Sequence, residues 1–227
     1  IPRAVANLRF FAHAATQFAS ESHHGEAGLN YTLRAPLGVV AAISPWNLPL
    51  YLFTWKIAPA LAAGNTVVAK PSEITPATAT MLGMLAAEIG LPRGVLNIVH
   101  GSGPAVGEPL VLHPAVKAVS FTGSTAVGRR IAGLAGPQLK KVSLELGGKN
   151  ATLVFANSDW RAHLDTLLRS AFQNAGQICL CGSRLLVQQA IHDEFREALV
   201  ERARALQAGP LDEPATRLGA MVSQAHF

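Results

Sequence analysis

The sequence predicts an α/β fold built on an open, mostly parallel sheet. Short apolar runs rich in β-branched residues alternate along the chain with longer helical patterns, which is typical of strand–helix–strand units. Polar side chains follow several of the predicted strands, and ligands of such sheets bind at the carboxyl ends of the strands. The composition, with 49% hydrophobic and 15% charged residues, indicates a compact globular protein.

The first half of the chain predicts two buried strands, over residues 38–44 and 66–70, separated by a helix over residues 50–63. A second helix is expected to begin with Thr75 as its cap and Pro76 in its first turn. Its apolar residues recur at helical spacing and fall on one face; they are Met81, Leu82, Leu85, Ala86 and Ile89.

The remaining elements continue the alternation. Further strands are expected at residues 94–99, 116–121, 141–146, 151–155 and 185–188, and helices after Pro104, from Thr125 through Leu134, and at residues 159–174 and 192–206. Residues 20–34 are polar and predict a loop or hairpin. The pair Gly147-Gly148 predicts a hinge, so we expect one α/β unit over residues 1–146 and the start of a second α/β unit over residues 147–227.

Charge and cysteine content exclude several classes of function. The net charge is +5, but the lysines and arginines are scattered, which argues against a nucleic-acid partner. Two cysteines, Cys179 and Cys181, are too few for a disulfide framework, and no metal site has ligand spacing. No run predicts a membrane span, so the cytoplasm is expected. The chain begins at Ile1 and ends at Phe227, and we expect it to be a piece of a longer protein.

Two segments carry candidate ligand-binding or nucleophilic groups. In residues 121–128, FTGSTAVG, a strand runs through Gly123 into a helix N-terminus, where N–H groups and the helix dipole favour a phosphate. A tight strand-to-helix turn explains that pattern about as well. Cys179 follows Gly176 and is a candidate nucleophile, although an isolated cysteine is more often a small buried residue.

Three further polar groups follow predicted strands. Glu145 ends an apolar strand, where burial would raise its pKa and suit a general base; alternatively it pairs with a lysine such as Lys149. Asn47 lies between two prolines and suits an oxyanion donor, or simply forms a turn. Lys70 and Glu73 suit a cofactor ribose, or form an exposed ion pair of little energetic value.

Together, five segments in this order resemble the aldehyde dehydrogenase superfamily. They are Pro45-Trp46-Asn47, Lys70-Pro71-Ser72-Glu73, Phe121-Thr122-Gly123-Ser124, Leu144-Glu145-Leu146-Gly147-Gly148 and Gly176-Gln177-Ile178-Cys179. The resemblance runs from about Arg34 onward and implies a Rossmann-like cofactor domain followed by the beginning of a catalytic domain. Among members, the sequence looks most like the branch that acts on 2-aminomuconate and 2-hydroxymuconate semialdehydes.

The resemblance implies roles for individual residues. Cys179 matches the nucleophile, Glu145 the general base and Asn47 the oxyanion donor, and Cys181 matches no functional position. The implied cofactor is NAD, since Glu73 beside the ribose would repel a 2′-phosphate. Positions implied to lie along the cofactor are Ser44, Trp46, Lys70, Glu73, Gly101, Gly123, Ser124, Val127 and Leu146.

The resemblance also sets the functional expectation. An aldehyde is oxidised to its acid through a thiohemiacetal and a thioester on Cys179, and an arginine such as Arg184 is a candidate partner for a substrate carboxylate. Family chains are about twice as long, so we assign the activity to a parent enzyme that is expected to be a homo-oligomer, a dimer or tetramer. The competing hypothesis is a truncated, inactive relative that acts as a binding or interaction module.

Overall fold

A computed structural model describes all 227 residues as two compact units, Ile1–Leu146 and Gly147–Phe227. The first unit contains a five-stranded sheet in the order β5-β4-β3-β6-β7, and every neighbouring pair of its strands is parallel. The α/β class with a parallel sheet is therefore confirmed. None of the helices is long and apolar enough to cross a membrane.

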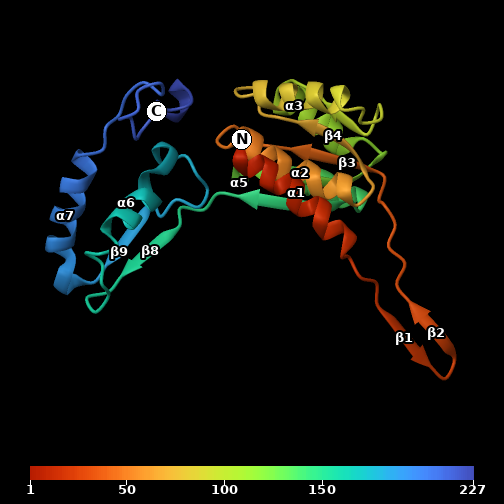
Figure 1. The fold of residues 1–227 in the computed structure, drawn as a ribbon, viewed down its shortest axis with the longest axis horizontal. Helices are drawn as coiled ribbons and strands as arrows, with labels where there is room; N and C mark the ends of the chain where they lie inside the picture. Colours follow the sequence, from red (N-terminus) through yellow and green to blue (C-terminus); the bar gives the residue numbers. More distant parts are fainter. The chain divides into compact units, whose positions relative to one another are not determined.

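The elements of the first unit follow the expected alternation (Figure 1). The sheet strands are β3 (Val39–Ile43), β4 (Thr66–Lys70), β5 (Leu96–Ile98), β6 (Val116–Gly123) and β7 (Lys141–Leu146). The helices are α1 (Pro2–Thr16), α2 (Pro49–Ala62), α3 (Ala77–Glu88), α4 (Glu108–Leu112) and α5 (Thr125–Ala135), with the short turns η1 (Gly103–Gly107) and η2 (Gly136–Gln138).

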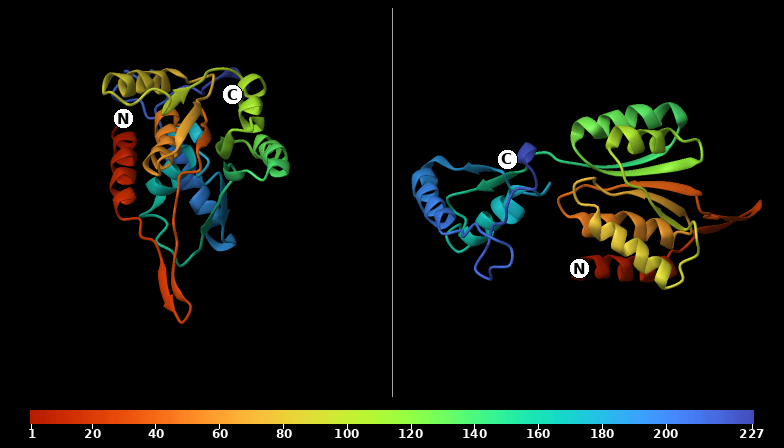
Figure 2. Two further views of the ribbon diagram at one scale, coloured as in Figure 1. Left: turned by 90° about the vertical axis from the view of Figure 1, so that its right-hand side faces the viewer. Right: turned by 90° about the horizontal axis from the view of Figure 1, so that it is seen from above.

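Helices cover both faces of this sheet (Figure 2). On one face, α2 and α3 pack over a cluster that contains Ala42, Phe53, Val67 and Ala69. On the other face, α4 and α5 pack over a second cluster, with Val119 and Phe121 among its members. Strand β3 contributes to both clusters, with Ala41 and Ile43 in one and Ala42 in the other, because successive side chains of a strand point to opposite faces.

The predicted hairpin over residues 20–34 is confirmed. Strands β1 (Ser22–Gly25) and β2 (Gly28–Tyr31) pair antiparallel, and every residue in them is exposed. The hairpin projects from the first unit as an arm (Figure 1).

The second unit is a smaller α/β structure. Strands β8 (Ala151–Val154) and β9 (Arg184–Val187) pair parallel, and α6 (Leu164–Phe172) and α7 (His192–Arg204) accompany them. Its short turns are η3 (Gln173–Gly176), η4 (Gln189–Ile191) and η5 (Gln224–His226). Trp160 and Phe195 form the centre of its core, with ring centroids 5.3 Å apart.

Three local predictions were wrong or incomplete. Thr75 does not cap α3, because its hydroxyl lies 3.4 Å from the Trp46 carbonyl oxygen and Pro76 takes the cap position without a side-chain bond. On the predicted apolar face of α3, Leu82 packs against the core, whereas Met81, Leu85 and Ile89 are exposed. The helix expected over residues 159–174 begins only at Leu164, and α1 was not anticipated at all.

Candidate functional site

A cavity of about 640 Å³ lies at the carboxyl ends of the central strands of the first unit. Its size is in the range of small-molecule and cofactor sites. The wall is built from the ends of β3, β4 and β6, from η1 and the start of α4, and from α5. Of the nine positions proposed for the cofactor, seven line it: Ser44, Trp46, Lys70, Glu73, Gly123, Ser124 and Val127.

The remaining two proposed positions do not line the cavity. Gly101 precedes η1 and has a φ of 146°, a conformation that favours glycine. Leu146 lies half-buried at the end of β7, where it packs with the cluster under α5. A Cβ atom at Gly128 would lie 2.5 Å from a methyl carbon of Leu146, so the glycine lets α5 approach the strand end closely.

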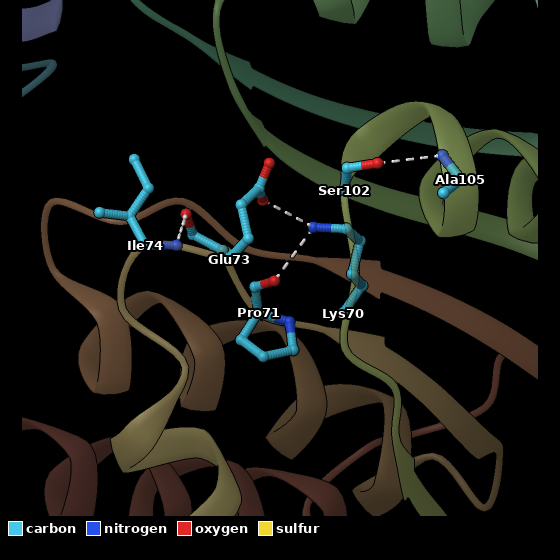
Figure 3. A network of polar contacts seen from close by, with 7 residues as sticks. Lys70, Pro71, Glu73, Ile74, Ser102 and Ala105 are labelled. Carbon is cyan, nitrogen blue, oxygen red and sulfur yellow. Dashed lines mark hydrogen bonds and ion pairs between the residues drawn. The ribbon is translucent and has the colours of Figure 1, made fainter.

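Lys70 and Glu73 form one polar corner of the cavity (Figure 3). The Lys70 side chain is 3% exposed, and its Nζ lies 3.0 Å from Glu73 Oε2 and 3.2 Å from the Pro71 carbonyl oxygen. Burial by itself raises the pKa of the Glu73 carboxyl, but hydrogen bonds from its own backbone and from Lys70 outweigh burial and leave that pKa below its usual value. The pair therefore presents an ionised carboxylate oriented by a buried cation.

Ser44 contributes a buried hydroxyl at the end of β3. Its Oγ has no hydrogen-bond partner within the protein, although the residue is only 4% exposed and lines the cavity. A buried polar atom without a partner is unfavourable, so such atoms are frequently satisfied by a ligand. The orphaned hydroxyl therefore indicates that the cavity accepts a polar molecule.

The N-terminus of α5 faces the same cavity. Ser124 caps the helix, since its Oγ accepts a hydrogen bond from the Val127 N–H at 3.3 Å. The first turn of a helix has N–H groups without acceptors inside the helix, and the helix dipole favours an anion there. The start of α5 therefore offers N–H donors to the cavity, and the phosphate site expected from the sequence stays a prediction.

Gly123 is required by close packing at the strand end. A Cβ atom at this position would lie 2.4 Å from Cζ of the Phe121 ring, which is itself buried in the core. The backbone therefore runs against the ring just before the helix cap. A larger residue here would displace either Phe121 or the loop that faces the cavity.

The expected burial of Glu145 was wrong, because β7 is the edge strand of the sheet and the residue is exposed. The β6–β7 register pairs Glu145 with Thr122, and Ser120 lies two residues earlier on the same face of β6.

The sequence interpretation missed Lys56, a buried cation near this carboxylate. Lys56 projects from α2, is 7% exposed and donates to Ser120 Oγ at 3.1 Å. Burial lowers the pKa of Lys56 to about 8, although Glu145 acts in the opposite direction. Only the position of Lys56 within an otherwise apolar helix, PLYLFTWKIAPALA, could have marked it beforehand.

Asn47 lies just before α2, in the turn between Pro45 and Pro49, as the sequence suggested. Tyr51 follows Asn47 by four positions, and the Arg3 guanidinium lies over its ring. Arg3 Cζ is 5.4 Å from the centroid of the Tyr51 ring. Asn7 fixes α1 against α2 by donating to the Tyr51 carbonyl oxygen and to Thr54 Oγ1, both at 3.1 Å. The arginine was also missed, because it belongs to the helix that the sequence analysis did not predict.

Cys179 lies in an exposed turn of the second unit, after α6 and η3. Asn150 donates to the Cys179 carbonyl oxygen at 2.7 Å, and the Cys181 N–H donates to the Ile178 carbonyl oxygen at 3.0 Å. Cys181 is buried, so the two cysteines occupy different environments. Arg184 begins β9 and donates to the Lys149 carbonyl oxygen at 2.9 Å, which ties its Nε to the backbone.

Comparison with known proteins identifies relatives along the whole chain. The family model described as "Aldehyde dehydrogenase family" matches residues 1–227. A 2-aminomuconic semialdehyde dehydrogenase from Bos taurus is 53% identical over 100% of this chain and 47% of its own length. A 2-hydroxymuconic semialdehyde dehydrogenase from Pseudomonas sp. (strain CF600) is 46% identical over 100% of this chain and 48% of its own.

Solved structures share the fold as well. A betaine aldehyde dehydrogenase from Staphylococcus aureus, crystallised in complex with NAD⁺, superimposes with a TM-score of 0.93 at 38% identity. The match covers 97% of this chain and 44% of that one. The chain thus spans about half the length of the relatives it matches.

Proposed function

Because the chain belongs to the aldehyde dehydrogenase family, we propose that its parent enzyme oxidises an aldehyde to the carboxylic acid with NAD as hydride acceptor. The observation that carries this proposal is the cavity, in which a helix N-terminus, a buried cation and an ionised carboxylate occur together with an orphaned hydroxyl. The substrate class is a muconate-type semialdehyde, as in the relatives that cover the whole chain.

The cavity fits a dinucleotide by its donor and acceptor groups. The N-terminus of α5 would hold the phosphates, and the Ser44 hydroxyl offers one more polar contact. Glu73 would accept hydrogen bonds from two ribose hydroxyls, with Lys70 beside it. A 2′-phosphate would lie against the Glu73 carboxylate, and like charges repel, so NAD is favoured over NADP.

The bound dinucleotide supplies a hydride acceptor, and residues of this chain supply the remaining chemistry. The Cys179 thiolate attacks the aldehyde carbon, and its S–C bond forms as the carbonyl electrons move to oxygen. The Asn47 amide and the Cys179 backbone N–H donate to that oxyanion. When the oxyanion re-forms the carbonyl, the hydride leaves carbon and a thioester remains on Cys179.

Glu145 completes the cycle as a general base. It takes a proton from water as the water oxygen attacks the thioester carbon, and the S–C bond breaks to release the acid and the Cys179 thiolate. An exposed carboxylate at the edge strand is accessible to water, which suits this role. The proton on Glu145 then passes to solvent.

Arg3 is the proposed partner for the carboxylate of a semialdehyde substrate. It lies over Tyr51, one helical turn from Asn47, and α1 holds it there through Asn7. We favour Arg3 over Arg184, because Arg184 Nε already donates to the backbone at Lys149. A homo-oligomeric parent and a cytoplasmic location stay predictions from the sequence.

The test is formation of reduced nicotinamide, followed by absorbance, in the chain and in the whole polypeptide that contains it. The substrates are 2-hydroxymuconate semialdehyde and an uncharged aldehyde, and the variants are Cys179→Ala and the matched control Cys181→Ala. We expect turnover in the wild type and in the control but none in Cys179→Ala. In Arg3→Gln, KM should rise for the semialdehyde and not for the uncharged aldehyde, while Arg9→Gln on the same helix should leave both unchanged.

Two results would contradict the proposal. Equal activity in Cys179→Ala and wild type would remove the covalent mechanism. A folded whole polypeptide that binds NAD but oxidises no aldehyde would leave the binding-module hypothesis in its place.

A further inference from the structure

Another cavity, of about 420 Å³, lies at the base of the hairpin arm, and none of the proposed roles uses it. It forms where the C-terminal ends of α1 and α2 meet the segment that follows the hairpin. Its volume is in the range of sites for small organic molecules. It shares no lining residue with the cavity at the strand ends.

The wall of this cavity is apolar and consists mainly of small side chains. Ala14 and Ala15 of α1 and Ala62 and Ala63 at the end of α2 line it, so the helix ends leave space that larger side chains would fill. Phe11 and Phe18 supply aromatic surface. A ligand with an apolar body would remove this surface from water, which is favourable.

Arg34 is the single charged residue among those that line the cavity. Its guanidinium lies over the Phe18 ring, with Cζ 4.9 Å from the ring centroid. The ion pairs of the structure involve other arginines, so no carboxylate of the protein neutralises Arg34. One planar face of the guanidinium contacts the ring, whereas its N–H edge has the fork geometry that binds a carboxylate through two parallel hydrogen bonds.

The surroundings of the cavity favour an anion beside Arg34. Neither α1 nor α2 contains an aspartate or a glutamate. The C-terminal ends of the two helices carry partial negative charge, which acts against an anion. Arg34 carries a full charge that a bound carboxylate would contact directly, and a charge-assisted hydrogen bond is stronger than the effect of a helix end.

We propose that this cavity binds a monocarboxylate with an aromatic body, such as an arylalkanoate. The aryl group lies against the alanine wall beside Phe11, and the carboxylate pairs with the Arg34 guanidinium at the rim. This binding site is additional to the proposed oxidation of an aldehyde. It is also separate from the proposed contact of a substrate carboxylate with Arg3, which does not line the cavity.

Phe11 connects the cavity to a fluorescent side chain. Its ring meets the Trp55 ring edge-on, with centroids 5.6 Å apart, and the Trp55 centroid lies 6.0 Å from that of Tyr51. A ligand that packs against Phe11 therefore changes the environment of Trp55. Tryptophan emission should report on binding at this place in the fold.

The experiment measures the dissociation constant of phenylbutyrate by titration calorimetry and follows tryptophan emission in parallel. Phenylbutanol has the same body without the charge, and butyrate has the charge without the ring. Phenylbutyrate should bind the wild-type chain about five- to tenfold more tightly than phenylbutanol, as expected for one charge-assisted pair at an exposed site. Butyrate should bind more weakly than phenylbutyrate by about tenfold, because it buries less apolar surface.

Four variants locate the ligand. Arg34→Gln should lower the affinity for phenylbutyrate to that for phenylbutanol, and should leave phenylbutanol unchanged. Ala15→Trp fills the cavity and should abolish binding of both compounds, whereas Ala12→Trp, exposed on the same helix but outside the cavity, should behave as wild type. Trp55→Phe should keep the affinity for phenylbutyrate and lose the change in emission.

Three results would overturn this inference. Equal affinity of the wild type for phenylbutyrate and phenylbutanol would remove the role of Arg34. Binding that survives Ala15→Trp would place the ligand outside the cavity. Loss of phenylbutyrate binding in Arg3→Gln, with wild-type affinity in Arg34→Gln, would place the ligand at the proposed substrate contact. No arm of the experiment uses NAD or an aldehyde, so failure of this site is distinguishable from failure of the proposed function.

Discussion

Replacing Lys56 by methionine is expected to stabilise the first unit at neutral pH. Lys56 is buried, and burial lowers its pKa from 10.5 to about 8. A shift of about 2.5 pKa units corresponds to about 3 kcal/mol by which the native fold disfavours the charged form. Methionine has a similar volume and no charge, but it also gives up the hydrogen bond to Ser120, worth about 1 kcal/mol. The expected net gain at about pH 7 is therefore about 2 kcal/mol.

The stability advantage of the methionine variant over the wild type should disappear at alkaline pH, because protonation of Lys56 is linked to unfolding. Between about pH 8 and 10.5 the native protein releases the Lys56 proton while the unfolded chain keeps it. The unfolded state then binds more protons, so wild-type stability rises with pH across this window. The methionine variant lacks this contribution, and its lead over the wild type should vanish by about pH 10.5.

The measurement is urea denaturation of both proteins at about pH 7 and about pH 10, followed by tryptophan fluorescence. The first unit contains Trp46 and Trp55, and the second contains Trp160, so two transitions can be assigned. Lys141→Met, on an exposed lysine, is the control and should show no pH-dependent difference. A methionine variant less stable than wild type at neutral pH, or a difference that does not change with pH, would refute the reasoning.

Other perturbations have equally definite outcomes. Gly123→Ala should lower the free energy of unfolding of the first unit by about 1–3 kcal/mol, because the added Cβ would clash with the Phe121 ring. Thermal denaturation measures this loss, and Gly133→Ala, where a Cβ has open space, is the control. Ser124→Ala should remove about 1 kcal/mol by loss of the α5 cap and weaken NADH binding, measured by fluorescence titration; unchanged stability would show that the cap is dispensable. Phe195→Ala should lower the free energy of unfolding of the second unit by about 3–5 kcal/mol, as reported by Trp160, and should not shift the transition reported by Trp46 and Trp55. A shift of both transitions would contradict two independent cores.

The strand–helix alternation and the strand-end position of the polar residues were predictable from sequence, because periodicity and glycine placement are local signals. The order of the strands and the ion pair of Glu108 with Arg130 at the strand-end cavity were not, since they depend on contacts between distant segments. Glu108 and Arg130 are separated by 22 residues, and Lys56 and Ser120 by 64. Neither spacing carries a motif.

Burial was the least predictable property. Glu145 was expected inside because its neighbours are apolar, yet β7 is an edge strand and leaves it exposed. The apolar face of α3 was expected to pack as a whole, but only Leu82 and the nearby Ala79 contact the core. Periodicity shows which residues share a face, but the surrounding elements decide whether that face is covered.

The register of strand β7 against β6 determines where the Glu145 carboxylate lies. Its alternation places Leu144 and Leu146 toward α5 and Glu145 toward α2. A slip of one residue against β6 would exchange the faces and direct Glu145 into the apolar layer, and a slip of two would move the carboxylate about 7 Å along the sheet. Leu146 fits closely against Gly128 in the observed β6–β7 register. The packing that stabilises this edge of the sheet therefore also fixes the position of the Glu145 carboxylate.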